Sequence, residues 1–132
     1  PFCQDSAVMM SVDVPDPDVD AGQVIVSLTV FSADPIDQLA SFGTERAAGE
    51  SEHRYSLGTI TFDQPDWNAR IDQLESALDT LLDLLDPLPE AVLHAEGTVV
   101  RIFMTLPRGA ETISARLVRR LANTNATLWI DT

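Results

Sequence analysis

The stretch DWNARIDQLESALDTLLDLL, residues 66–85, decides the fold class of this chain. Its large apolar side chains follow one another in steps of three and four, which is the spacing of one face of an α-helix. Pro65 precedes the stretch and Pro87 stops it. Each buried member contributes roughly 1.5–3 kcal/mol before ordering entropy is subtracted, so we expect this helix to be a main support of the core. The members are Trp67, Ile71, Leu74, Leu78, Leu81, Leu82 and Leu85.

Four segments around this helix have the composition of β-strands. Residues 24–31 (VIVSLTVF) alternate, with one face wholly apolar and the other half polar, which indicates a sheet with one side on the core. Residues 54–63 predict a second strand, and Gly58 inside it indicates a bulge or a close backbone approach. Residues 98–106 are almost continuously apolar, which is typical of a central strand covered on both faces. Residues 126–131 predict the last strand.

Shorter helices are expected between the strands. Asp34 and Pro35 suit a helix start, and Ile36, Leu39 and Phe42 supply a short apolar stripe. Residues 88–96 are either a helix remnant or the start of a strand. Ser114 can cap a helix over residues 115–122 whose Leu117, Val118 and Leu121 face inward. The order predicts an α+β two-layer sandwich, with a mixed four- to five-stranded sheet and helices mainly on one face. A doubly wound sheet is the alternative.

The length of 132 residues suits one domain and one hydrophobic core. Residues 1–23 are interpreted as an N-terminal extension, in which residues 6–14 are apolar enough for one additional short strand. Residues 24–132 are interpreted as a single α+β domain. Cys3 is the only cysteine, and the first residues lack the basic and apolar regions of a secretion signal, so we expect a cytoplasmic protein.

The net charge of −13 narrows the class of partner. Phosphate would be repelled over most of such a surface, so we expect no nucleic acid, and no apolar run is long enough for a membrane span. A basic protein partner would be attracted. Residues 1–100 hold 19 acidic residues and three arginines, a balance of −16, whereas residues 101–132 hold five arginines and two acids, a balance of +3. A partner therefore meets two differently charged regions unless folding interleaves them.

Two opposite charge clusters are the candidate sites. Asp72, Glu75, Asp79 and Asp83 are spaced by three or four residues, so they lie along one side of the long helix and would suit a basic partner. An ordinary solvated face is the other interpretation. The remaining cluster, Arg116, Arg119 and Arg120, could hold an anionic ligand, although cations late in a helix also suit its dipole.

Catalytic and metal-binding patterns are weak. His53 and His94 lie in no recognisable motif, and Cys3 lies near the terminus, where a nucleophile is poorly held. Residues 16–22 (DPDVDAG) imitate the start of a calcium loop, but the glycine comes one place late and Ser27 stands where a glutamate belongs. We therefore expect a solvated acidic turn, no enzyme, no metal and no cofactor.

The order of elements from residue 24 to residue 131 resembles a small bacterial family of domains of unknown function. The resemblance lies in the first strand and its Asp34-Pro35 helix, the leucine-rich residues 71–85, the strand 99–105, and the closing segments ISARLV (113–118), LAN (121–123) and TLWID (127–131). Proteins of this general form include immunity partners of bacterial toxins, so the resemblance implies toxin neutralisation. We expect a non-catalytic immunity protein that occludes its toxin through an acidic surface, or alternatively an anionic-ligand or regulatory domain. The sequence leaves the oligomeric state open.

Overall fold

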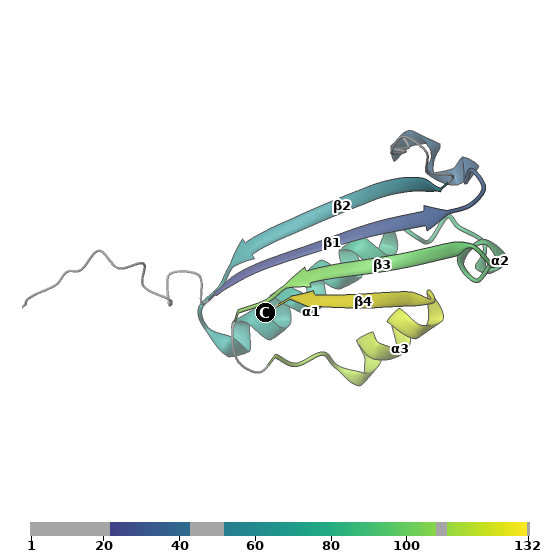
Figure 1. Ribbon diagram of the computed structural model, residues 1–132. Helices are drawn as coiled ribbons and strands as arrows, with labels where there is room; N and C mark the ends of the chain where they lie inside the picture. The colour runs from purple at the N-terminus through teal and green to yellow at the C-terminus, as the bar shows by residue number, and fades with distance from the viewer. Residues whose placement is uncertain (1–21, 43–51, 108–110, 132) are drawn as a thin grey trace, which may run out of the picture.

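The computed structural model describes residues 22–42, 52–107 and 111–131, whose strands form one sheet (Figure 1). The strands are β1 (Gln23–Ser32), β2 (His53–Asp63), β3 (Thr98–Thr105) and β4 (Ala126–Asp131). Their order across the sheet is β2-β1-β3-β4. β1 is antiparallel to both of its neighbours, and β3 is parallel to β4. The mixed sheet confirms the α+β prediction, while the antiparallel pairing of β1 is not that of a doubly wound sheet.

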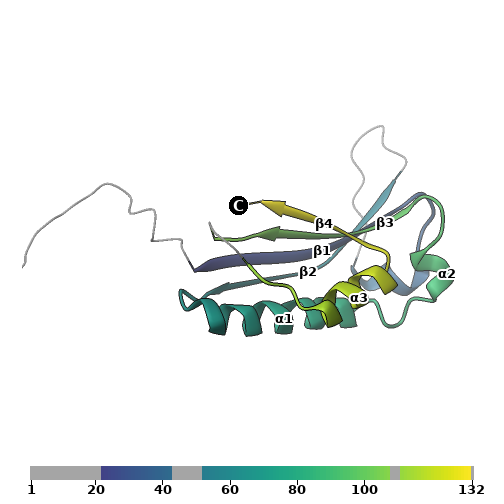
Figure 2. The ribbon, with the colours of Figure 1, turned by 90° about the horizontal axis from the view of Figure 1, so that it is seen from below.

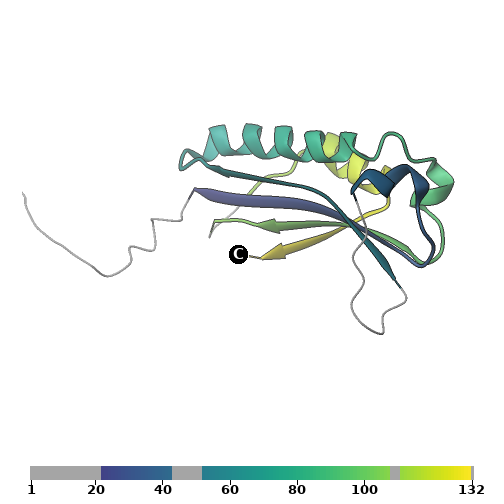
Figure 3. The same cartoon turned by 90° about the horizontal axis from the view of Figure 1, so that it is seen from above.

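The helical elements are α1 (Trp67–Asp83), the short α2 (Glu90–Leu93) and α3 (Ala115–Asn123), together with the 3-10 helix η2 (Asp37–Phe42). Figures 2 and 3 show α1 and α3 on the same side of the sheet. The segment 88–96, which the sequence left open between helix and strand, contains α2. The additional strand predicted in residues 6–14 lies outside the described residues.

The core lies between the sheet and α1. The inward residues of β1 are fully buried, because their alternation turns every second side chain toward the helix layer. From α1 and the turn after it come Leu74, Leu78, Leu81, Leu82 and Leu85, all buried as predicted. Trp67 is not part of this core, because it begins the first turn of α1 and stays 45% exposed.

A polar side chain caps the N-terminus of both α1 and α3. Asp66 accepts a hydrogen bond from the backbone N–H of Ala69 at 2.9 Å at the start of α1. Ser114 accepts one from Leu117 N–H at 3.3 Å at the start of α3. In α3, Leu117 and Leu121 are buried, but the expectation for Val118 is wrong: this side chain points away from the core and is 53% exposed.

Gly58 marks a β-bulge, as predicted. β1 pairs Leu28 with Gly58 and the next residue, Thr29, with Ser56, so Leu57 is the extra residue of β2. The site is also a close approach, because a Cβ on Gly58 would lie 3.2 Å from a methyl group of Leu81. The glycine lets α1 pack closely against β2 at this point.

β3 occupies an inner position of the sheet, between β1 and β4. Val100, Ile102 and Met104 are fully buried beneath the helices. The expectation that both faces are covered is wrong for the described residues, because α1 and α3 lie on one face and the alternate residues of β3 stay partly exposed on the other. The sheet therefore has an outer face without a described helix.

Candidate functional site

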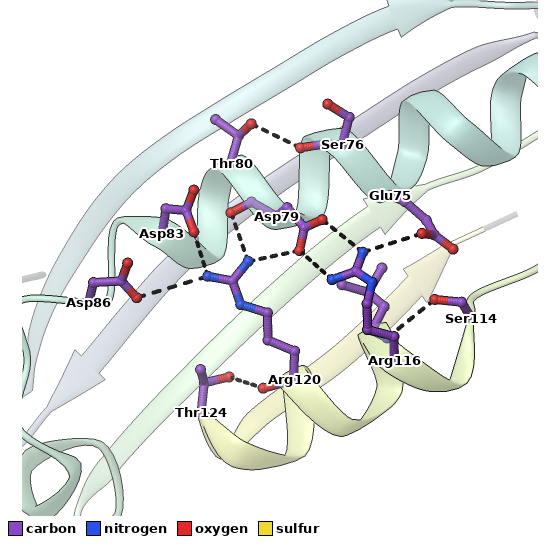
Figure 4. Close-up of polar contacts among 11 residues, drawn as sticks. Glu75, Ser76, Asp79, Thr80, Asp83, Asp86, Ser114, Arg116, Arg120 and Thr124 are labelled. Atoms are coloured by element: carbon purple, nitrogen blue, oxygen red, sulfur yellow. Dashed lines mark hydrogen bonds and ion pairs between the residues drawn. The ribbon is translucent and has the colours of Figure 1, made fainter.

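The two charge clusters predicted from the sequence meet in the structure. α3 packs beside α1, and its Arg116 and Arg120 reach across to the acidic side of α1 (Figure 4). Arg116 lies 2.8 Å from Asp79 and 3.3 Å from Glu75. Arg120 lies 2.8 Å from Asp79 and 2.5 Å from Asp83. Folding thus interleaves the acidic and basic parts of the chain, and we name these five residues the α1–α3 ion-pair network.

Asp79 is the centre of this network, since both arginines donate to its carboxylate. The hydrogen bond from Arg116 lowers the pKa of Asp79 most strongly, and Arg120 adds to this against the opposing effect of desolvation. Reciprocally, Asp79 raises the pKa of Arg116, and Asp83 raises that of Arg120. Asp79, Arg116 and Arg120 therefore stay charged at neutral pH.

The network changes what each cluster can offer to a partner. Arg116 and Arg120 are already engaged, so an anionic ligand would have to displace carboxylates of the same chain. In the described part of the chain, no ion pair joins Asp72 or Arg119 to another residue, and both side chains are exposed. Asp83 keeps 61% of its side chain exposed, and Asp86 lies 3.9 Å from Arg120 at the helix end. The outward carboxylates of α1 therefore outnumber the guanidinium groups.

A second ion pair is buried. The side chain of Arg70 in α1 is 7% exposed and pairs with Glu111, whose side chain is 6% exposed. Its Nε and Nη2 donate to the two carboxylate oxygens at 3.0 and 2.9 Å, and its Nη1 donates to the carbonyl oxygens of Gln64 and Pro65. These bonds raise the pKa of Arg70, with Glu111 as the main cause. Because the Arg70 guanidinium group donates to atoms of the same chain and is buried, we interpret this pair as structural.

A pocket of about 300 Å³ lies where the β1–η2 connection meets α2 and the start of β3. Three exposed carboxylates line it, from Asp34, Asp37 and Glu96, and its described lining contains no arginine. Its other walls are mainly apolar, with Ile36 and Val92 among them. Such a pocket can take a long cationic side chain, whose aliphatic part lies on the apolar wall and whose charge lies at the carboxylates.

On the outer face of the sheet, three aromatic side chains form a cluster with one arginine. The guanidinium carbon of Arg101 lies 5.0 Å from the ring centre of Phe31 and 5.3 Å from that of Trp129. Phe103 lies beside Trp129, with ring centres 6.0 Å apart. The two cation–π contacts hold Arg101 in place on this face.

The histidines and possible metal ligands form no comparable site. His94 follows α2 and is exposed, with Nε2 at 3.1 Å from the carbonyl oxygen of Asn123. In residues 22–42, 52–107 and 111–131 no three His, Cys, Asp or Glu side chains are grouped so that they could hold a metal ion. Nor does any helix in these ranges have the length and apolar character that crossing a bilayer requires.

Comparison with known proteins gives no relative: no family model, no curated protein and no solved structure matches this chain.

Sequence reasoning missed the pocket and the ion pairs for a common reason. Asp34 and Glu96 come from segments far apart in the chain, and no periodic pattern connects them. The position of Arg101 beside Phe103 could have been predicted, because the alternation of β3 places both side chains on the same face of the sheet. The strand order needed to add Phe31 and Trp129 was not available from the pattern alone.

Proposed function

We propose that this chain is a non-catalytic protein-binding domain, and that it acts in the bacterial cytoplasm as an immunity protein, neutralising a basic toxin by occlusion. The scaffold of this proposal is a two-layer α+β sandwich. The observation that carries the proposal is the pocket lined by Asp34, Asp37 and Glu96, since it combines apolar walls with three carboxylates that form no ion pair within the described residues. A lysine or arginine of the toxin is the side chain that this combination recognises.

The outward carboxylates of α1 and of the turn after it supply a second area of negative charge. Asp72, Asp83 and Asp86 are exposed, and the two arginines of the network do not balance the acids around them. A net charge of −13 attracts a basic protein over a distance set by the ionic strength. We therefore infer that these carboxylates attract the toxin at long range, and that the pocket makes the close contact with it. Glu75 and Asp79, which the sequence placed on the same acidic face, serve mainly to hold α3 through Arg116 and Arg120.

The resemblance to bacterial domains that include immunity proteins supports the choice of a toxin as the partner. The anionic-ligand function at Arg116, Arg119 and Arg120 takes second place, because Arg116 and Arg120 already bind carboxylates of α1 and only Arg119 lacks an ion pair in the described chain. A thermal-shift screen with phosphorylated metabolites tests that alternative. Stabilisation that disappears in Arg119→Ala but not in Asp72→Asn would support it.

The main experiment begins with the tagged chain purified from its native host and its partner identified by mass spectrometry. The affinity of that partner is then measured for three variants, each of which replaces carboxylates by neutral amides. One neutralises the pocket (Asp34→Asn, Asp37→Asn, Glu96→Gln), and one neutralises the outward carboxylates (Asp72→Asn, Asp86→Asn). The control neutralises two carboxylates elsewhere (Glu52→Gln, Asp63→Asn).

We expect the pocket variant to weaken binding by about tenfold or more, mainly through faster dissociation. The α1 variant should slow association and flatten its salt dependence, whereas the control should change neither by more than about twofold. Growth of cells that express the toxin should follow the same order. A partner that is itself acidic, or equal affinities for the pocket variant and the control, would contradict the proposal.

A further inference from the structure

β4 is an edge strand with large apolar side chains on both of its faces. Trp129, on the outer face, is 55% exposed, and Ile130, on the helix side, is 47% exposed. The other large apolar side chains exposed in the described chain are Val118 of α3, Phe42 and Trp67. Exposed apolar residues on a free strand edge favour pairing with another strand.

The opposite edge of the sheet is protected. β2 contains the bulge at Leu57 and Gly58, which twists a strand edge, and its exposed positions are polar, with Arg54, Ser56, Thr59 and Thr61. β4 has a regular register with β3, contains no proline, and carries a single charge, at Asp131. The two edges therefore differ in the features that proteins use to prevent strand addition.

The register with β3 fixes which backbone groups of β4 are free. Asp131 pairs with Thr105, and its carbonyl oxygen accepts a hydrogen bond from Leu106 N–H at 2.9 Å. Since N–H and C=O of one strand residue point to the same side, residues 127, 129 and 131 face β3. The N–H and C=O groups of Leu128 and Ile130 therefore face the open edge.

We propose that two copies of this chain pair through β4, antiparallel and about a two-fold axis at Trp129. In such a pair, side chains share a face only when both paired residue numbers are odd or both are even. Trp129 then lies opposite Trp129 of the second copy, and Leu128 opposite Ile130 of the second copy. Leu128 and Ile130 exchange both backbone hydrogen bonds with those residues, because theirs are the groups that face outward. The interface is self-complementary, as two-fold symmetry requires.

The side chains of β4 are compatible with this antiparallel register. The rings of Trp129 meet at a closely spaced pair, where side chains approach most nearly. Thr127 lies opposite Asp131 of the second copy and can donate its hydroxyl to that carboxylate. Figure 1 shows α3 beyond the outer edge of β4, and Figures 2 and 3 show it in the helix layer, so no described helix or strand lies in the plane of the sheet beside β4.

Charge favours this edge over the rest of the surface. β4 itself carries a single charge, at Asp131, and Arg101 lies against Trp129 on the outer face, so pairing through β4 brings few like charges together. The copies still repel at long range, because each has a net charge of −13. Added salt screens this repulsion, so the dimer should become stronger as the salt concentration rises. Binding of a basic toxin has the opposite salt dependence.

The experiment measures the mass of the full chain by sedimentation, over a range of protein and salt concentrations. We expect twice the chain mass of 14.4 kDa at high concentration. Ile130→Pro removes one outward N–H that no strand of the same chain uses, so it should give a folded monomer. Ile130→Lys should weaken the dimer at least tenfold. The matched control, Phe42→Lys, changes an exposed apolar residue away from β4 and should remain a dimer.

The register is tested by disulfide formation in a Cys3→Ser background with oxidised glutathione. Thr127→Cys with Asp131→Cys places the two new thiols opposite each other across the axis, so a covalent dimer should form. Thr127→Cys alone leaves its copies about 13 Å apart along the strands, too far for a disulfide. A native chain that stays monomeric, an Ile130→Pro variant that stays dimeric, or cross-linking of the single variant alone would each overturn the proposal. None of these outcomes bears on toxin binding at the pocket.

Discussion

The guanidinium group of Arg70 faces the carboxylate of Glu111 in a two-pronged pair that joins residues 41 positions apart in the chain. Both side chains are buried, and Arg70 also donates to two backbone carbonyl groups just before α1. The pair thereby ties the start of α1 to the segment that leads into α3. Removal of either partner would leave the other charged group buried without a counter-charge.

Glu111→Ala should destabilise the protein by about 3–5 kcal/mol, because it leaves the buried charge of Arg70 without a counter-charge. The double variant Arg70→Met with Glu111→Leu should be markedly more stable than Glu111→Ala, since an apolar pair of similar volume avoids the unpaired charge. Urea unfolding at pH 7 measures both. A double variant that is less stable than the single variant would contradict this explanation.

The contribution of Asp79 should depend on pH. Its pKa is lowered in the folded protein by Arg116 and Arg120, while the unfolded chain has the ordinary value of about 3.9. The stabilisation is therefore fully present above the unfolded pKa and is lost as the pH falls through the folded pKa. At pH 7, Asp79→Asn should cost about 1 kcal/mol, the range of partly exposed ion pairs, and this difference should shrink below about pH 4.

Asp72→Asn is the matched control for that series, because Asp72 lies on the same helix and has no ion pair in the described chain. Its free energy of unfolding should stay close to that of the unchanged protein at every pH. Urea unfolding between pH 7 and pH 3 compares the three proteins. A difference for Asp79→Asn that does not vary with pH would show that charge is not its source.

Tyr55→Phe should destabilise the protein by about 1–3 kcal/mol. The hydroxyl oxygen of Tyr55 accepts a hydrogen bond from Ile36 N–H at 2.8 Å, and Tyr55 is almost completely buried. Removing the hydroxyl leaves a buried backbone donor without its partner. Chemical denaturation gives the loss, and circular dichroism checks that the fold is retained. A loss below about 0.5 kcal/mol would mean that Ile36 N–H finds another acceptor.

Two glycines should respond differently to alanine. A Cβ on Gly22 would lie 2.5 Å from backbone atoms of Gln64 and Pro65, so the chain itself would have to move. On Gly58 the nearest atom is a methyl group of Leu81 at 3.2 Å, which can shift by rotation. Gly22→Ala should therefore cost about 1–3 kcal/mol, and Gly58→Ala clearly less. Thermal and urea unfolding of the two variants test this order, and each is the control for the other.

The sequence predicted the elements better than the contacts between them. The apolar periodicity of α1, the alternation of β1 and the Ser114 cap are local signals, and the structure has each of them in place. Trp67 and Val118 were misplaced because a helical stripe does not show where the covering layer ends. The charged groups were hardest to predict. Arg116 and Asp79 were assigned to separate surfaces, and only the packing of α3 against α1 brings them together.

The position of β4 gives it a protective role for the strand next to it. Among the described strands, β4 lies at the edge of the sheet and is the only neighbour of β3 on that side. A chain clipped by a protease before Ala126 would expose the long, almost uncharged run of β3, in which Val99, Ile102 and Phe103 have strong β-propensity. Loss of β4 would therefore leave a molecule that is more prone to aggregate through β3.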